Sequence, residues 1–161
     1  MRLGITIERL VDATPELQCL IAELNEVLAA AYPPHQRHGL SLDRLFEPHM
    51  RFFLARLDRA AVGCGGVALF GDYAEVKRMY TREASRGRGV AKALLRRIEE
   101  EARLAGAPVL YVETGTHQRE AIGLYERTGF QRCAAFGPYA EMPSENIETS
   151  LFLTKALAAR G

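Results

Sequence analysis

The stretch SRGRGVAKALLRRIEEEARLAG, residues 85–106, decides how the fold and the function of this sequence are predicted. Its amphipathic helical pattern begins at two glycines, although glycine favours helix less than any residue except proline. The first N–H groups of a helix have no intrahelical partner, and the helix dipole concentrates partial positive charge beside them. Gly87 and Gly89 let a ligand approach the backbone closely, and Arg86 and Arg88 add charge-assisted donors that suit phosphate. The pattern therefore predicts a phosphate or pyrophosphate site at this helix start.

Two familiar nucleotide-binding patterns do not fit this turn. A P-loop requires Gly-Lys-Ser/Thr, but Lys92 stands between two alanines. A dinucleotide-binding fingerprint requires a third glycine where this chain has lysine, and it follows the first strand rather than a later one. From residues 86–91 alone, a second interpretation stays open, in which the glycines form only a tight turn and the arginines are solvated.

Length, net charge, cysteine count and apolar runs limit the classes of protein to which this sequence can belong. A length of 161 residues predicts one domain over residues 1–161, and the formal net charge of +1 gives no overall attraction for nucleic acid or anionic membranes. The three cysteines form no zinc or disulfide pattern, so no metal is expected. No apolar run approaches the roughly 20 residues of a membrane span, and the N-terminus lacks the apolar core of a signal peptide. We therefore expect a cytoplasmic protein that has neither nucleic acid nor membrane as a partner.

Hydrophobic periodicity and turn signals predict the order of the elements. Strands are expected at residues 5–11, 51–57, 61–70, 73–81, 109–115, 131–137 and 149–157. Helices are expected at residues 14–32, 85–106 and 118–130, with a loop and one short helix over 35–49 and a loop over 138–146. Three successive strands followed by alternating helices and strands predict an α/β (α+β) fold, in which a mixed sheet carries helices on both faces.

Two motifs, taken together, resemble those of the GNAT superfamily of acyl-CoA-dependent N-acyltransferases. The first family motif, [QR]-x-x-G-x-[GA] opening a helix after a strand, stands here as RGRGVA, residues 86–91. The second, N-x-x-A-x-x-L-Y-x-x-x-G-F, stands as QREAIGLYERTGF, residues 118–130. One predicted strand separates them, as in the family. The resemblance is close over about residues 60–155, whereas the first 60 residues fit only by element order.

The resemblance implies a mixed, mostly antiparallel sheet of about six to seven strands, which splays between residues 74–81 and 109–114. It further implies that acetyl-CoA enters this split as a cosubstrate. Met79 and Thr81 would contact its pantetheine arm, and the amides from Gly87 to Ala91 would hold its pyrophosphate. The residues expected to bind the cofactor are Met79, Thr81, Arg86, Gly87, Arg88, Gly89, Val90, Ala91 and Gln118. The last of these replaces the asparagine that is usual in the family.

The same resemblance implies roles for two catalytic residues. Tyr125 matches the tyrosine that protonates the coenzyme A sulfur in many family members, and the Met79 amide would stabilise the developing oxyanion. Glu75 stands where some members carry a carboxylate base. Glu113, on the next predicted strand, is a rival for that role, and a water chain is a further alternative.

The expected reaction is acetyl transfer to the primary amine of a small molecule, such as an amino acid or a polyamine-like acceptor. His35 and His38 lie where the family places its acceptor wall, and either could assist proton removal. Arg37 and Arg78 indicate an acceptor that carries a carboxylate or a phosphate. Two other functions remain open: a non-catalytic acyl-CoA-binding or regulatory module, and an acetyltransferase for protein N-termini or lysines. A homodimer is expected because the family is often dimeric.

Overall fold

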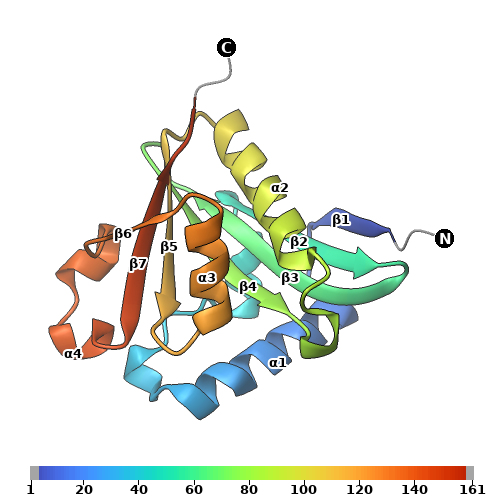
Figure 1. Ribbon diagram of the computed structural model, residues 1–161, viewed down its shortest axis with the longest axis horizontal. Coiled ribbons are helices and arrows are strands. Elements are labelled where there is room, and N and C mark those ends of the chain that lie inside the picture. The colour runs from blue at the N-terminus through green and yellow to red at the C-terminus, as the bar shows by residue number, and fades with distance from the viewer. Residues whose placement is uncertain (1–3, 159–161) are drawn as a thin grey trace.

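The computed structural model describes residues 4–158 and shows a seven-stranded mixed sheet with helices packed against it (Figure 1). The strands lie in the order β1-β2-β3-β4-β5-β7-β6. Their bounds are Ile5–Leu10 (β1), Met50–Leu57 (β2), Ala60–Leu69 (β3), Ala74–Thr81 (β4), Val109–Gly115 (β5), Gln131–Cys133 (β6) and Ser150–Ala156 (β7). Strands β4 and β5 are parallel, and the other neighbouring pairs of this described sheet are antiparallel. The predicted α/β fold with a mixed, mostly antiparallel sheet is confirmed.

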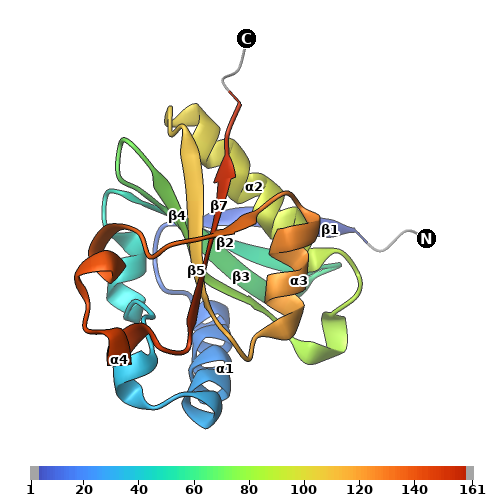
Figure 2. The same cartoon turned by 60° about the vertical axis from the view of Figure 1, so that its left-hand side comes forward.

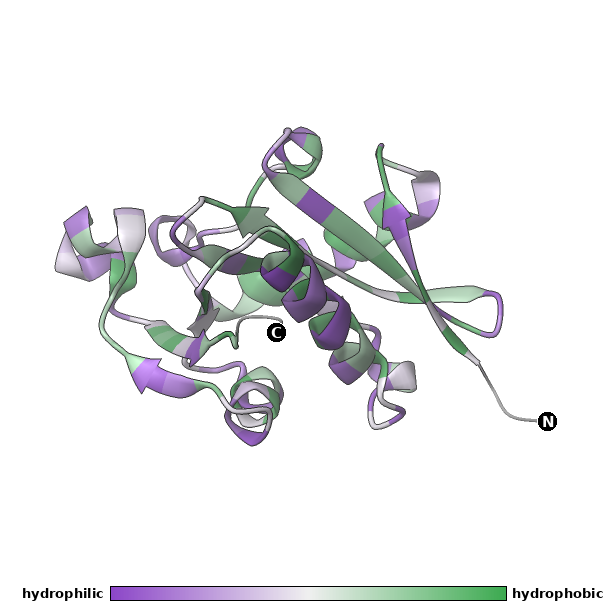
Figure 3. Ribbon diagram, turned by 90° about the horizontal axis from the view of Figure 1, so that it is seen from above, coloured by the Kyte–Doolittle hydropathy of each residue, from purple (hydrophilic) through white to green (hydrophobic). Residues whose placement is uncertain are grey.

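Three longer helices cover the sheet, and their apolar stripes decide which face each one buries. They are α1 (Pro15–Ala31), α2 (Val90–Leu104) and α3 (Arg119–Arg127). Leu94 and Ile98 of α2 belong to one core layer, together with Tyr125 of α3. Leu17 and Leu20 of α1 belong to a second layer. In Figure 3 the ribbon of α2 alternates between hydrophilic and hydrophobic residues, as expected of a helix with one face in solvent.

Strand β2 shows that these two layers lie on opposite faces of the sheet. Successive side chains of a strand point to opposite sides. Phe53 and Ala55 are buried in the layer that contains α2, and Phe52 and Leu54 are buried in the layer that contains α1. The predicted placement of helices on both faces is therefore confirmed.

The sheet opens between β4 and β5. These strands pair only where Ala74–Val76 lies beside Leu110–Val112, and the two strands diverge beyond that point (Figures 1 and 2). A bulge accompanies the opening, because the register between β3 and β4 shifts at Cys64/Gly66. Within the bulge, Arg78 takes a φ of 56°, in the left-handed region. The splayed centre that the resemblance predicted is confirmed.

The strand predicted over residues 131–137 is wrong beyond Cys133. The short helices in the described part of the chain are η1 (Pro34–Gln36), η2 (Leu42–Phe46), η3 (Glu83–Ser85), η4 (Gly137–Glu141) and α4 (Ser144–Ile147). Phe136 and Tyr139 lie in an aromatic cluster with Phe152, so the apolar residues that suggested a strand instead pack as a turn leading into η4. Likewise, η1 and η2 occupy the segment where a single short helix was expected.

Candidate active site

The helix start that was predicted to bind an anion has its glycines in the left-handed backbone region. Gly87 takes a φ of 79° and Gly89 a φ of 86°, and α2 begins only after them, at Val90. A β-carbon at either glycine would meet no other part of the described chain closer than 3.9 Å. The N–H groups of Gly89 and of residues 90–92 donate to no acceptor within residues 4–158. The turn therefore presents open backbone amides, and its backbone angles are what require glycine.

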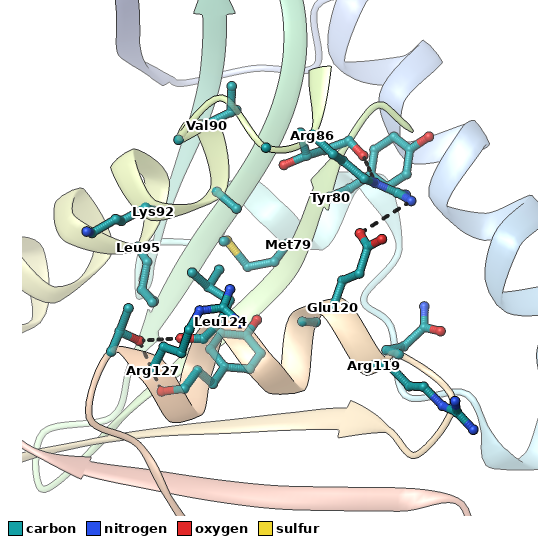
Figure 4. Close-up of a pocket in the computed structure, with 18 of the residues that line it drawn as sticks. Met79, Tyr80, Arg86, Val90, Lys92, Leu95, Arg119, Glu120, Leu124 and Arg127 are labelled. Carbon is teal, nitrogen blue, oxygen red and sulfur yellow. Dashed lines mark hydrogen bonds and ion pairs between the residues drawn. The ribbon is translucent and has the colours of Figure 1, made fainter. Parts of the chain in front are cut away.

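A cleft of about 1030 Å³ separates α2 from α3 (Figure 4). Of the residues predicted to bind the cofactor, it brings together Met79, Thr81, Arg86, Gly87, Gly89, Val90, Ala91 and Gln118. Arg88 is exposed and is not among the lining residues. Met79 lines this cleft together with Leu95 of α2 and Leu124 of α3, all three labelled in Figure 4. The opened part of β4 thus faces a cleft whose end is the glycine turn.

Five lysines and arginines outside the predicted set also line this cleft. Lys92 and Arg96 lie on α2, Arg119 and Arg127 lie on α3, and Lys155 lies on β7. The Lys155 ammonium already pairs with the Glu99 carboxylate at 2.9 Å. The spacing of Lys92 and Arg96, one helical turn apart, is the sequence signal that could have found that pair.

Arg86 connects the end of β4 with α3. Its Nε donates to the Thr81 carbonyl at 3.2 Å, and its Nη1 lies 3.6 Å from the Glu120 carboxylate (Figure 4). The Glu120 side chain is 78 % exposed, and exposed ion pairs of this kind contribute little to stability. The guanidinium is therefore held beside the glycine turn by contacts that a phosphate could replace.

A second space, called the polar chamber below, lies beside the cleft and has a volume of about 130 Å³. Its charged and polar lining comes from Tyr32, Gln36, Arg37, His38, Glu75, Lys77, Arg78, Glu113, Thr114, Gln118, Tyr125 and Tyr139. The chamber and the cleft meet at the five residues that line both of them, which are Leu24, Met79, Gln118, Ala121 and Tyr125. His38 lines it, whereas His35 does not.

Tyr125 occupies the junction of the two spaces. Its side chain is 3 % exposed and its ring packs against Phe130, whereas its hydroxyl has no hydrogen-bond partner within residues 4–158. Burial raises the pKa of Tyr125, and the nearby Glu113 charge adds to that rise. The hydroxyl is therefore protonated near neutral pH and can act as a proton donor.

Glu75 is buried in the wall of the polar chamber and already has two partners. The Tyr139 hydroxyl donates to its Oε2 at 2.7 Å, and the Lys77 ammonium lies 2.8 Å from the same oxygen. Lys77 also donates to the Tyr139 hydroxyl at 3.1 Å, which closes a three-membered network. Lys77 shares a face with Glu75 because it lies two residues along the strand, a spacing visible in the sequence. Tyr139 comes from a segment that was predicted to be a loop.

Glu113 of β5 also lines the polar chamber, and its carboxyl differs from that of Glu75 in its pKa. Burial raises the pKa of Glu113 above its ordinary value, and the Glu75 charge adds to the rise, while the Ser150 hydroxyl and the charges of His38 and Lys77 oppose it. A carboxyl with a raised pKa takes up and releases a proton closer to neutral pH. This side chain therefore has the character expected of a general base at the chamber.

His38 is fixed in one hydrogen-bonding arrangement. Its Nε2 lies 2.8 Å from the Asn146 carbonyl oxygen, which can only accept a hydrogen bond. Nε2 therefore carries the proton, and in the neutral ring Nδ1 is left as an acceptor. The ring also meets Tyr139 edge-on.

Within residues 4–158, no group of three or more histidine, cysteine, aspartate or glutamate side chains is arranged to hold a metal ion. No helix of this described part is both long enough and apolar enough to cross a membrane. Burial raises the pKa of the Cys64 thiol to about 12, so this thiol is not a thiolate near neutral pH.

The chain is similar to known proteins along nearly its whole length. The model of the Acetyltransferase (GNAT) family matches residues 14–130. The chain is 41 % identical to the "IAA acetyltransferase" of Azospirillum brasilense, over 96 % of this chain and 99 % of that protein. It is 38 % identical to the "Uncharacterized N-acetyltransferase YsnE" of Bacillus subtilis strain 168, over 78 % of this chain and 82 % of that protein.

Solved structures share the fold. A Klebsiella pneumoniae protein assigned to the acyl-CoA N-acyltransferases superposes with a TM-score of 0.74 at 32 % identity, covering 96 % of this chain and 98 % of the other. A GNAT family acetyltransferase from Elizabethkingia anophelis, solved with acetyl-CoA bound, superposes with a TM-score of 0.65 at 18 % identity. That match covers 95 % of this chain and 98 % of the other.

Proposed function

The chain belongs to the acetyltransferase (GNAT) family, and on that premise we propose that it moves an acetyl group from acetyl-CoA to the primary amine of a small molecule. One observation carries this proposal. A long cleft with an open amide turn and a small chamber with carboxylates meet at Met79 and Tyr125. The long cleft suits the cofactor and the chamber suits the amine, so both reactants can be held together for direct attack in a ternary complex.

The fit of the cofactor to the cleft is supported by the chemistry of its lining. The amides that follow Gly87 suit a pyrophosphate at a helix start, and Lys92 and Arg96 supply further positive charge along the same wall. The unpaired part of β4, up to Thr81, offers backbone groups to the amides of a pantetheine arm. The Elizabethkingia neighbour, which shares this fold, was solved with acetyl-CoA bound.

Acetyl transfer requires three actions of the protein. A base removes a proton from the acceptor ammonium so that the nitrogen has a lone pair for attack on the thioester carbon. The Met79 amide donates a hydrogen bond to the carbonyl oxygen as it becomes negative. As the carbon–sulfur bond breaks, Tyr125 gives its proton to the departing thiolate. The products are an acetylated amine and coenzyme A.

Between the two candidate bases, we favour Glu113. Glu75, the first choice from the sequence, already accepts a hydrogen bond from Tyr139 and pairs with Lys77, and both partners engage the same carboxylate oxygen. Glu113 is held by burial in a state that favours proton uptake. In this proposal Glu75 orders the chamber wall, and Glu113 takes the proton from the amine.

The proposed function is tested by release of free coenzyme A thiol during incubation with acetyl-CoA and a panel of small amines. Turnover with at least one amine is expected. Saturable acetyl-CoA binding without turnover on any acceptor, protein N-termini and lysine peptides included, would favour the non-catalytic module instead. Turnover on peptides alone would favour the protein acetyltransferase, although a chamber of about 130 Å³ suits a small acceptor better. A cytoplasmic location and a homodimer remain predictions.

Glu113→Gln is expected to lower turnover by about 100-fold and to raise stability at alkaline pH. The raised pKa of Glu113 means that the folded protein binds this proton more tightly than the unfolded chain does. The associated stability is present while the carboxyl is protonated and is lost as the pH rises through the folded-state pKa. Glutamine cannot lose a proton, so the variant should melt at a higher temperature than the parent at pH 8. The expected rise is about 2–4 °C for each kcal/mol gained in the free energy of unfolding.

The difference in melting temperature should shrink toward zero near pH 4, where the parent carboxyl is also neutral. Thermal melts of both proteins across this pH range measure it. Glu26→Gln is the matched control, because Glu26 is exposed on α1 and lines neither space. Equal melting temperatures at pH 8, together with unchanged turnover, would return the role of base to Glu75.

A further inference from the structure

Two arginines of the polar chamber have no carboxylate partner. Arg37, from the loop after η1, makes no ion pair within residues 4–158, and Arg78 of β4 contacts only the Asn25 amide oxygen through a side-chain hydrogen bond. The Nε atoms of both guanidiniums are buried without a hydrogen-bond partner. A buried donor left without an acceptor destabilises the folded protein, so an arrangement with two of them requires an explanation.

The backbone brings these two guanidiniums to the chamber. Arg78 lies in the bulge of β4 with its left-handed φ of 56°, which turns it out of the ordinary alternation of the strand. Its guanidinium lies directly against Gly39, where any side chain would overlap it. Arg37 stands two residues earlier in the same loop. Both residues line the chamber that Glu113 also lines.

The charges of the chamber do not cancel. Lys77 and Glu75 neutralise one another at 2.8 Å. Arg37 and Arg78 make no ion pair within residues 4–158, and neither does Glu113, the second carboxyl of the chamber. The lining therefore has one part that attracts an anion and another that can attract and deprotonate an amine.

Resting on the proposed function, we propose that the acceptor is a small amino acid, whose carboxylate is bound by Arg37 and Arg78 while its amine faces Glu113. A guanidinium binds a carboxylate through two parallel hydrogen bonds, and this would give the unpartnered donors an acceptor. The chamber has a volume of about 130 Å³, far less than the cleft, so it suits a small ligand. A polyamine would place a second cation beside two arginines.

The test compares amino acids with their carboxamides in the thiol-release assay. Alanine, serine and aspartate are paired with their C-terminal amides, and putrescine and aminomethylphosphonate are added. The parent protein is expected to prefer the acids. Arg37→Met should raise KM for the preferred acid by about 10- to 100-fold and leave kcat and the KM for acetyl-CoA nearly unchanged. Arg59→Met is the control, because Arg59 is an exposed turn residue outside both spaces.

Equal KM values for acids and amides, with no effect of Arg37→Met, would overturn the inference and leave the proposed function standing. Preference for putrescine or for the phosphonate would also overturn it. If no amine is acetylated, calorimetric titration of the amino acids into the coenzyme A complex still tests whether the carboxylate site exists. Saturable binding that Arg37→Met weakens and Arg59→Met does not would support the carboxylate site, and no binding would overturn it. Arg78→Lys, which keeps the charge but loses the two-pronged geometry, serves as a second variant should Arg37→Met fail to fold.

Discussion

Gly89→Glu is expected to abolish measurable binding of acetyl-CoA. Gly89 precedes α2 at a φ of 86°, and its amide opens the row of N–H groups that we assign to the pyrophosphate. A glutamate there would place a carboxylate where the phosphate is expected, and repulsion would replace attraction. Losing two charge-assisted hydrogen bonds of about 1.5–3 kcal/mol each weakens binding by more than about 100-fold. Isothermal titration with acetyl-CoA measures the effect.

A matched control separates loss of the ligand site from backbone strain. Gly71 has a φ of 85°, and a β-carbon there would meet nothing within 4 Å, so Gly71→Glu imposes the same strain at a turn that lines neither space. Circular dichroism should show similar folded spectra for both variants, and only Gly89→Glu should lose acetyl-CoA binding. Retained affinity in Gly89→Glu would remove the amide turn from the cofactor site.

Tyr125→Phe is expected to lower kcat by about 100-fold or more while the dissociation constant for acetyl-CoA changes little. The substitution removes one hydroxyl, which is held protonated by burial and has no partner in residues 4–158. The ring and its packing against Phe130 remain, so the helix and the cleft should keep their shape. Without the hydroxyl, the thiolate must leave without its proton. Steady-state kinetics and titration calorimetry on the same preparation separate the two effects.

Tyr73→Phe is the control for this prediction. Tyr73 packs in the aromatic cluster near Phe136 and lines neither the cleft nor the polar chamber. Its variant should turn over acceptor at the parent rate. If Tyr125→Phe also keeps the parent rate, the thiolate receives its proton from another group, and the proposed acid is wrong.

The glycine turn before α2 could be predicted from the sequence, because a few neighbouring residues determine its backbone conformation. Gly87 and Gly89 indicated a turn with positive φ, and the structure has both there. The roles of Tyr125 and Glu75 remain predictions, although both side chains do line the spaces that meet at the sheet opening.

The parts that depend on distant segments could not be predicted from one sequence. Tyr139 meets Glu75 across 64 residues of chain, and it lies in η4, where the sequence predicted only a loop. This contact and the ion pair with Lys77 engage the carboxylate of Glu75, whereas Glu113 makes no ion pair within residues 4–158. Neither periodicity nor spacing contains such information, since burial and pairing arise only when the sheet and the loop pack together.

If acetyl-CoA binds as proposed, the opening between β4 and β5 would couple the stability of the fold to the supply of this cofactor. Past Val76 the inner edge of β4 lacks a neighbouring strand in its ladder, so a bound acyl carrier would act as a surrogate strand that exists only in the native state. Ligands of that kind add RT ln(1 + [L]/Kd) to the free energy of unfolding, about 2.7 kcal/mol at a concentration of 100 Kd. The protein would then resist proteolysis longer when acetyl-CoA is abundant in the cell and for a shorter time when it is scarce.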